Sequence, residues 1–413
     1  MNSLVYTLGA LGTAQTWGRA ALDGSMRHLV PVLLGRADYV LPGTSTPLRQ
    51  AFTGVYWPVD FVLRVLVVFF YEAVDGSHPA TSAIGIYFLG QYLGCLVVMY
   101  TDSLRGSRPS VLRSVRFPPP PVCMYGSARG ADMSCVTRRR ATMWSLLFQL
   151  TAIGCTGWVW ALSFLSTSAT VVVGGGGGGG EPRDRGKAGL LGASSVRDSL
   201  SIYLLPPAFL LGYVVPAVAM ALPSPGMVSE AFQQYAIAAW NMFPLLVLAA
   251  HHAVGAAAKT TAAASRGFWG GASPAASHLR SVRVVNLLTL VATCACHWSV
   301  VGVSLASVLF PSVFAPGYAR ELGPGSLALP PVAITQGETF GDGVRSFMLW
   351  DQVFGYSLVG LVVLAQVHRA AGACGQATGP FRLALVTLAL SVVAGPGSAI
   401  LIMSWWRDEM VFA

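Results

Sequence analysis

The sequence has little charge. Asp, Glu, Lys and Arg make up only 10% of its 413 residues, and hydrophobic residues make up 54%. Soluble domains carry roughly 25% charged residues. So few charges exclude a soluble domain with an ordinary solvated surface, and the composition is that of a membrane protein.

The sequence is instead rich in long apolar segments. Stretches of roughly 20 residues, the length that crosses about 30 Å of hydrocarbon, recur along the chain. They predict an all-α, polytopic membrane helix bundle with about eight transmembrane helices, at residues 55–75, 81–101, 143–171, 200–222, 232–257, 284–310, 347–368 and 382–405. We expect residues 1–50 to form an N-terminal interfacial or loop segment. Residues 51–413 are expected to form a single transmembrane helical domain with a basic loop at 102–141 and a Gly-rich loop at 172–199.

Acidic residues are scarcer than basic ones, 17 against 26. Lys and Arg lie mainly in connecting segments, as the positive-inside rule arranges them, so nucleic acid is not expected as a partner. The densest basic group lies in the loop 102–141, which predicts that this loop faces the cytosol. With an even number of spans, both termini then lie in the cytosol, and we expect a multi-pass protein of the endoplasmic reticulum.

Motifs for metals and nucleotides are also missing. The seven cysteines lack metal-ligand spacing, and the chain has no Asp-Asp pair. Magnesium-dependent ionisation of a diphosphate would need clustered carboxylates, so we do not expect it. The seven glycines at 174–180 lack the Lys-Ser/Thr spacing of a phosphate-binding loop. We therefore expect neither a metal nor a cofactor.

Against this background, Glu72 and Asp75 are conspicuous because they stand at the edge of the first apolar run, just before a tight Gly/Pro hairpin that contains His78. They are three residues apart and share a helix face. Partial burial and mutual repulsion would raise a carboxyl pKa, so that one member could act as a general acid. The alternative is an ordinary helix end solvated at the membrane interface. Two further residues of this helix, Asp60 and Arg64, are expected to pair with each other.

A second acid, Asp351, lies inside a late apolar run next to Trp350 and near Phe354, where a surface role is harder to sustain. Phe69, Phe70 and Trp350 stand beside the acids, and their ring faces could stabilise a carbocation. Strict alternation of eight helices places Glu72 and Asp351 at opposite ends of the bundle. Either these two acids act at the two ends of one elongated cavity, or the predicted number of spans between them is wrong by one.

Three motifs, Asp75-Gly-Ser-His-Pro79, Tyr87-Phe-Leu-Gly-Gln91 and Trp350-Asp351, resemble those of fungal integral-membrane terpene cyclases of meroterpenoid biosynthesis, of the ascofuranone and ascochlorin type. The resemblance implies acid-initiated, redox-neutral cyclisation of a prenylated, epoxidised substrate. A separate pathway epoxidase would supply that substrate. It also implies catalytic roles and substrate contacts for the following residues: catalytic Glu72, Asp75 and Asp351; substrate-binding His78, Tyr87, Gln91, Phe69, Phe70, Trp350 and Phe354.

Two other classes of function stay open on the sequence. A proton-coupled or small-solute transporter would also keep carboxylates within helices, around a cavity at mid-bilayer. A scaffolding membrane protein would need none of these acids for chemistry. The polar side chain of Gln91 could equally line a pocket or make a hydrogen bond between helices.

Overall fold

The computed structural model describes residues 1–35, 39–41, 43–105, 132–167, 199–260, 274–334, 339–376 and 378–413. Most of the basic loop at 102–141 and of the Gly-rich loop at 172–199 therefore lies outside the described residues. The described part of the chain is helical and holds no β-strand, only an isolated bridge between Val40 and Pro47. The main helices are α1 (Asn2–Thr13), η1 (Ala14–Gly18), α2 (Arg19–Leu22), η2 (Ser25–His28), α3 (Val30–Leu33), α4 (Trp57–Val74), α5 (Pro79–Leu104), α6 (Asp132–Thr151), α7 (Ile153–Thr167), α10 (Ser199–Tyr203), α11 (Leu205–Phe209), η6 (Leu210–Val214), α12 (Val215–Met220), α13 (Glu230–Asn241), α14 (Phe243–Thr260), α16 (Pro274–Leu309), η7 (Pro311–Val313), α17 (Tyr318–Glu321), α18 (Pro324–Ala328), α19 (Phe340–Ala373), α20 (Pro380–Ala394) and α21 (Pro396–Phe412).

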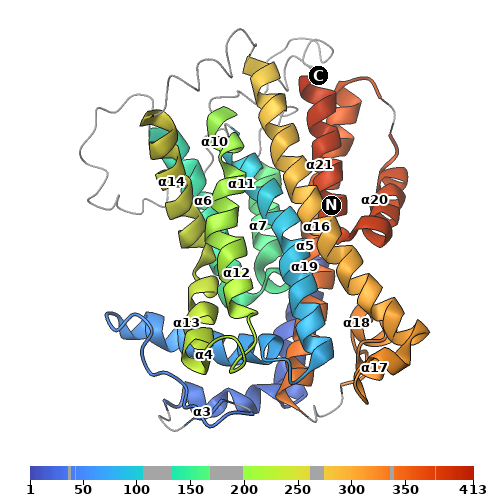
Figure 1. Ribbon diagram of the computed structural model, residues 1–413. Coiled ribbons are helices and arrows are strands. Elements are labelled where there is room, and N and C mark those ends of the chain that lie inside the picture. The colour runs from blue at the N-terminus through green and yellow to red at the C-terminus, as the bar shows by residue number, and fades with distance from the viewer. Residues whose placement is uncertain are drawn as a thin grey trace.

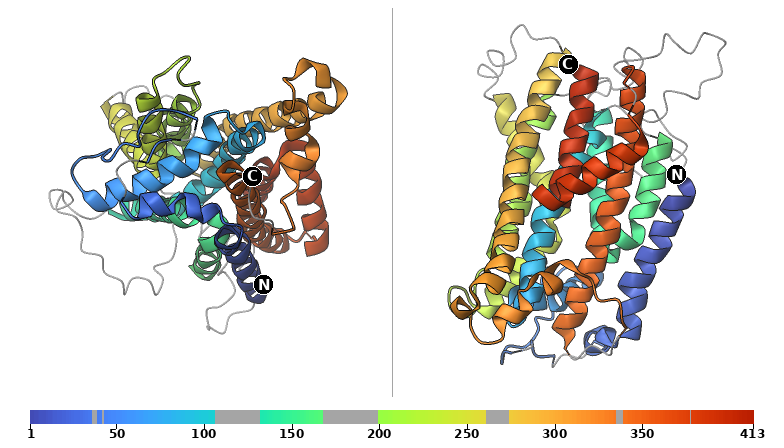
Figure 2. Two further views of the ribbon diagram at one scale, coloured as in Figure 1. Left: turned by 90° about the horizontal axis from the view of Figure 1, so that it is seen from below. Right: turned by 90° about the vertical axis from the view of Figure 1, so that its right-hand side faces the viewer.

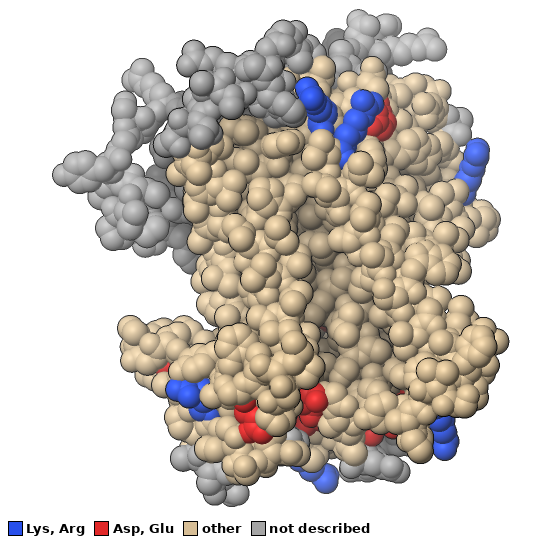
Figure 3. Space-filling model, viewed as in Figure 1, with Lys and Arg blue, Asp and Glu red and all other residues tan. Residues whose placement is uncertain are grey.

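Most of the long helices run side by side along one axis (Figure 1). Among the described residues, α5, α16 and α19 are long and apolar enough to cross a membrane, and the bent pair α13 and α14 would make a fourth. On the face in Figure 3, charged side chains gather at the two ends and leave an uncharged band between them. Apolar side chains of α16 and α20, such as Val291, Val308, Leu388 and Val392, are exposed. A helical membrane protein fits these features, while the count of eight spans is not confirmed.

Helix α4 differs in direction from the rest. The helix predicted at 55–75 forms at Trp57–Val74, but it lies across the lower end of the bundle instead of along it (Figures 1 and 2). A helix in this direction cannot cross the membrane beside α5. Its C-terminal end instead brings the predicted acid pair, Glu72 and Asp75, against the bundle from below.

The N-terminal segment is more regular than predicted. Residues 2–22 are continuously helical through α1, η1 and α2, and α1 runs along the bundle beside α7 (Figure 2). The approach is close at Gly12, where a Cβ atom would lie 2.1 Å from the carbonyl oxygen of Gly154. The sequence suggested only an interfacial or loop segment here, because Gln15, Thr16 and Arg19 interrupt the apolar run.

Several predicted spans are broken. The run 143–171 breaks at Ala152, which has a φ of 68°. The run 200–222 contains the π-helical turn η6, and 232–257 bends by 73° between α13 and α14. The run 382–405 is two helices that meet at Gly395, whose φ of 93° suits only glycine. Hydropathy shows that such segments are apolar but carries no signal for these interruptions.

Candidate functional site

The hairpin between α4 and α5 forms as the Gly and Pro residues predict. Asp75 is the C-terminal cap of α4, and its Oδ1 accepts a hydrogen bond of 3.1 Å from the backbone N–H of Ser77. Gly76 follows with a φ of 81°, and α5 begins at Pro79. The turn therefore folds Asp75 and His78 back toward the last turn of α4.

This fold brings together Glu72, Asp75 and His78, which we name the lower acid cluster. Glu72 is only 2% exposed, and its Oε2 lies 3.5 Å from Nε2 of His78. Burial, together with the charge of Asp75, raises the pKa of Glu72 to about 7. Burial also raises the pKa of Asp75, although its bonds from Ser77 and the nearby His78 oppose the shift. The cluster can therefore hold a proton near neutral pH.

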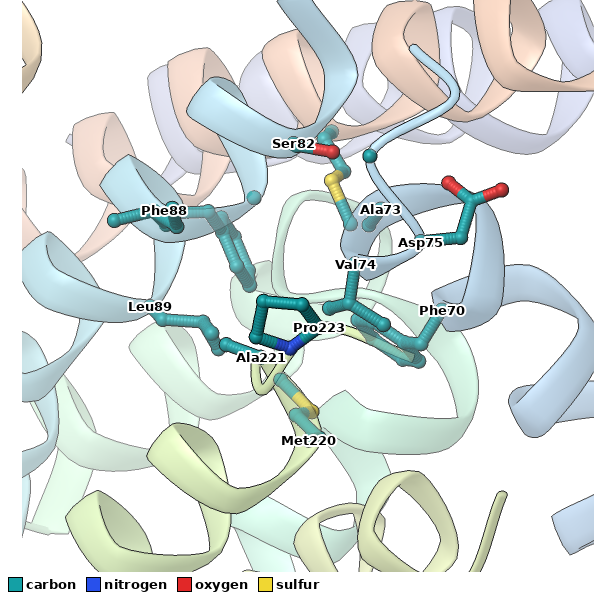
Figure 4. A pocket seen from close by; sticks show the side chains of 14 residues that line it. Phe70, Ala73, Val74, Asp75, Ser82, Phe88, Leu89, Met220, Ala221 and Pro223 are labelled. Atoms are coloured by element: carbon teal, nitrogen blue, oxygen red, sulfur yellow. The ribbon is translucent and has the colours of Figure 1, made fainter. Parts of the chain in front are cut away.

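An apolar cavity of about 260 Å³ lies beside the cluster, between α4, α5, the end of α12 and α19. Its lining is apolar except for Asp75 and Ser82, both labelled in Figure 4. The Asp75 carboxylate stands at the rim and points away from Phe88 and Leu89 (Figure 4). Glu72 does not line the cavity, but its neighbours Ala73 and Val74 do. On the face seen in Figure 3, the surface is hollowed between α12 and α16, over α5.

Aromatic rings form part of the cavity wall. Phe70 and Phe88 line it. Behind them, Phe70 packs on Trp240 with ring centroids 5.1 Å apart, and Phe88 stacks on Tyr92 at 5.5 Å. Of the aromatic residues predicted to contact substrate, Phe70 alone is in this lining. Phe69 instead packs against Phe347 of α19, at 5.3 Å.

Asp351 has a different environment. It is buried, and its Oδ1 accepts a hydrogen bond of 2.6 Å from the backbone N–H of Gly154, in the first turn of α7. The Nε1–H of Trp17 bonds to the carbonyl of Thr151, on the other side of the break at Ala152, at 2.8 Å. Asp351 thus caps a helix that begins inside the bundle, where its carboxyl oxygen meets the positive end of the helix dipole.

The two acids do not lie at opposite ends of the bundle. Helix α19 begins at Phe340, two turns before the predicted start at 347, and its first residues pack against the α4–α5 hairpin. The Oγ1 of Thr81 donates to the carbonyl of Gly341 at 3.0 Å. Asp351 is ten residues further along the helix than Gly341, and at about 1.5 Å per residue it lies about 15 Å above this contact. The sequence predicts opposite ends for Glu72 and Asp351 only if residues 55–75 cross the membrane, whereas α4 lies across the lower end of the bundle.

Other predicted contact residues join helices. The Tyr87 hydroxyl bonds to Nδ1 of His297 at 3.0 Å, and Gln91 joins α5 to the carbonyl of Thr293 and the backbone N–H of Gly397. The Nε1–H of Trp350 donates to Pro331, while its ring stacks on Phe354. None of these four predicted residues is in the cavity lining. Their predicted contact with substrate stays a prediction.

The expected pair of Asp60 with Arg64 does not form. Asp60 instead accepts hydrogen bonds from the backbone N–H groups of residues 52–54, which hold its pKa below the usual range. Arg64 donates to the carbonyl of Val32. Both residues fasten the N-terminal segment to α4.

The sequence also missed a second charged group, near the C-terminal ends of α5 and α21. The side chains of Asp102, Arg105, Arg407 and Asp408 are each at most 5% exposed and form what we name the upper ion-pair cluster. Arg407 is 2.9 Å from Asp102, which is 2.7 Å from Arg105. The i to i+3 spacing of Asp102 and Arg105 is a signal for this pair, but the sequence places Arg105 in the predicted basic loop at 102–141. Across the described ranges, no three His, Cys, Asp or Glu side chains form a group that could hold a metal ion.

Comparison with known proteins identifies relatives. The family described as the CtvD domain matches residues 10–118 and 123–412. The terpene cyclase ctvD of Aspergillus terreus (strain NIH 2624 / FGSC A1156) is 29% identical over 213 residues, 51% of this chain and 48% of the relative. The chain is thus matched over about half the length of this curated relative. No solved structure matches.

Proposed function

Since the chain belongs to the CtvD-domain family, we propose that it is a membrane-bound terpene cyclase that closes rings in a prenylated, epoxidised small molecule by acid-initiated, redox-neutral chemistry. The observation that carries the proposal is the lower acid cluster at the rim of an apolar cavity. The pKa of Glu72 is raised to about 7, so this carboxyl holds a proton under conditions in which an exposed one would not.

In the proposed reaction, Asp75 is the acid that reaches the substrate, because it stands at the rim of the cavity, whereas Glu72 lies behind the wall. Glu72 stores the proton and passes it to Asp75 by way of His78, which is near both carboxyls. The proton adds to the epoxide oxygen while the carbon–oxygen bond breaks toward oxygen. The resulting carbocation is attacked by the π electrons of an alkene in the same chain. Loss of a proton from the final cation returns the acid and leaves an isomer of the substrate.

The aromatic wall suits the cationic stage. The faces of Phe70 and Phe88 can stabilise positive charge without competing as nucleophiles. A cavity of about 260 Å³ is smaller than most ligand pockets, so it would hold the reacting end of a prenyl chain, with the rest along the hollowed face toward lipid. A membrane oxygenase that makes terminal epoxides is the proposed supplier. Endoplasmic reticulum membranes with cytosolic termini are the proposed setting.

The proposal gives Asp351 a positioning role. Its carboxylate is occupied by the first turn of α7 and is not in the cavity lining. It fixes the break in the α6–α7 segment and so shapes the wall contributed by α19. The resemblance implies instead that Asp351 is a second reacting carboxylate, and Asp351→Asn distinguishes the two roles.

One observation favours a transporter instead. Several predicted spans are broken within the bundle, and broken helices commonly build substrate and ion sites in secondary transporters. A transporter would carry a solute across a sealed vesicle without changing its mass or its retention. The same acids would then couple transport to protons.

The test is a mass-spectrometric assay of microsomes that contain the protein and are supplied with epoxides of farnesyl- and geranylgeranyl-phenols. We expect a product of unchanged mass and shifted retention, reduced at least about 100-fold in Asp75→Asn. Glu321→Gln, which changes an exposed carboxyl at the same end of the bundle, is the matched control and should keep full activity. No isomer across the panel, together with proton-dependent solute flux, would replace the cyclase proposal with the transporter.

A further inference from the structure

Ser82 is the second polar side chain in the cavity lining, and no residue that the structure describes bonds to its hydroxyl. Its Oγ is buried and has no hydrogen-bond partner within the described ranges, although its backbone N–H bonds normally to the carbonyl of His78. Figure 4 shows the hydroxyl at the end of the cavity nearest the α4–α5 hairpin, on the same side as Asp75. A buried hydroxyl without a partner is unfavourable, and buried polar groups in proteins usually find one.

The neighbouring Thr81 shows that this segment can satisfy a hydroxyl. Thr81 is 1% exposed, and its Oγ1 donates to the carbonyl of Gly341 in α19. Two successive residues at the start of α5 therefore carry a hydroxyl group, but only the hydroxyl of Thr81 makes a hydrogen bond within the described residues. Thr81 joins two helices, whereas Ser82 lies in the wall of an apolar cavity with its hydroxyl buried and its donor unused.

We propose that Ser82 is a specificity-determining residue whose hydroxyl donates a hydrogen bond to an oxygen atom at the reacting end of the bound prenyl chain. The proposal rests on the proposed function and sharpens it. A chain that ends in an alkene would leave the Ser82 hydroxyl unpaired, whereas an epoxide or hydroxyl oxygen completes it. Sites built to bond a polar group reject the analogue that lacks the group. Ser82 thus selects oxygenated chains and holds the oxygen on the side of the cavity where Asp75 stands.

The geometry of the wall supports this choice of ligand. Apart from Asp75 and Ser82, the cavity is lined by apolar side chains and glycines, including Phe70, Phe88 and Met348. An apolar chain with one terminal oxygen matches this distribution. A polar solute would leave its other hydrogen-bonding groups facing hydrocarbon.

The experiment measures binding of two probes to the full chain in lipid nanodiscs. The probes are farnesyl-phenol with a terminal epoxide and the same molecule with the terminal alkene, each competed against a photoreactive diazirine-bearing farnesyl-phenol. We expect the wild type to bind the epoxide roughly three- to tenfold more tightly, as one net hydrogen bond provides. Ser82→Ala should lower this ratio to about one without lowering the melting temperature. Ser82→Thr, which keeps a hydroxyl, should retain a preference.

Thr81→Val is the matched control. It removes the hydroxyl that joins α5 to α19, so the melting temperature should fall while the epoxide preference stays. If the wild type binds both probes equally, or if Ser82→Ala keeps the wild-type ratio, the assignment of Ser82 is overturned while the proposed cyclase stands. If the wild type captures neither probe, the proposed function itself fails, and the Ser82 assignment fails with it.

Discussion

Buried carboxylates occur at both ends of this molecule, but their partners differ. In the upper ion-pair cluster, Asp102 and Asp408 each contact arginines, and Gln366 adds a further hydrogen bond. In the lower acid cluster, Glu72 lies 3.5 Å from His78 and Asp75 accepts a hydrogen bond from Ser77, and neither carboxyl pairs with an arginine among the described residues. Burial of the side chain is similar for Glu72 and Asp102, which are 3% and 5% exposed. The partner therefore decides what a buried acid can do.

Arginine keeps a carboxylate charged and ties it to one geometry. The upper cluster consequently joins α5, α19 and α21 and has little freedom to exchange a proton. Without arginine, a buried carboxyl is more stable when protonated, and the lower cluster becomes a proton store next to a cavity. The comparison predicts that the upper cluster matters for folding and the lower one for chemistry.

The largest expected effect is on stability at the upper cluster. Arg407→Leu would leave Asp102 and Asp408 buried with Arg105 as their remaining arginine, and removing one partner of a buried ion pair costs about 3–5 kcal/mol. Thermal unfolding of the purified protein in detergent should show the loss, and activity should fall only with the amount of folded protein. A destabilisation under about 1 kcal/mol would show that the cluster does not hold the helices together.

A second effect separates the clusters by pH. Because the folded pKa of Glu72, about 7, lies above the ordinary value of 4.5, the folded state binds the proton more tightly than the unfolded state. Protonated Glu72 therefore contributes to the free energy of unfolding. This contribution is fully present below about pH 4.5 and is lost as the pH rises through about 7. We expect the free energy of unfolding of Glu72→Gln, relative to that of the wild type, to increase by up to about 3 kcal/mol between pH 4.5 and pH 8. Unfolding curves for both proteins at these pH values measure it, and parallel behaviour would contradict the raised pKa.

Asp351 lies between the two cases, since its partner is a helix end. Asp351→Ala should cost about 1–2 kcal/mol, the usual loss for an N-terminal cap. Asp351→Asn keeps an oxygen that can accept from Gly154, so its stability and its rate of product formation should stay within about threefold of the wild type. Loss of product in a stably folded Asp351→Asn would instead return this carboxylate to the reaction.

The sequence predicted those features that depend on local pattern. The scarcity of charge and the apolar runs indicated a helical membrane protein, and the spacing of Glu72, Asp75 and His78 correctly predicted that these groups meet. The predicted hairpin also forms, because Gly76 needs a positive φ and Pro79 can start a helix.

Features that depend on tertiary packing could not be predicted in this way. An apolar run does not reveal whether it lies along the bundle, as α5 does, or across its end, as α4 does. Ala152 carries no sign of a break, which depends on Trp17 and Asp351 from distant parts of the chain. Arg105 looked like a loop residue because its partner Asp408 is 303 positions away. Ser82 has no motif, and its unused hydroxyl is visible only in the folded cavity.

The smallest expected effect tests whether burial gives the upper cluster its strength. Arg283 of α16 and Glu409 of α21 form a bidentate ion pair, in which Nε and Nη2 of Arg283 donate to the two carboxylate oxygens of Glu409 at 2.7 and 2.6 Å. Glu409 lies two residues after Arg407 in α21. The side chains of this pair are 52% and 31% exposed, so water and salt screen the attraction, and exposed pairs contribute at most about 1 kcal/mol. Arg283→Leu should therefore change the unfolding free energy by less than about 1 kcal/mol, and less still in high salt. A loss equal to that of Arg407→Leu would mean that charge pairing between these helices, whatever its exposure, stabilises the bundle.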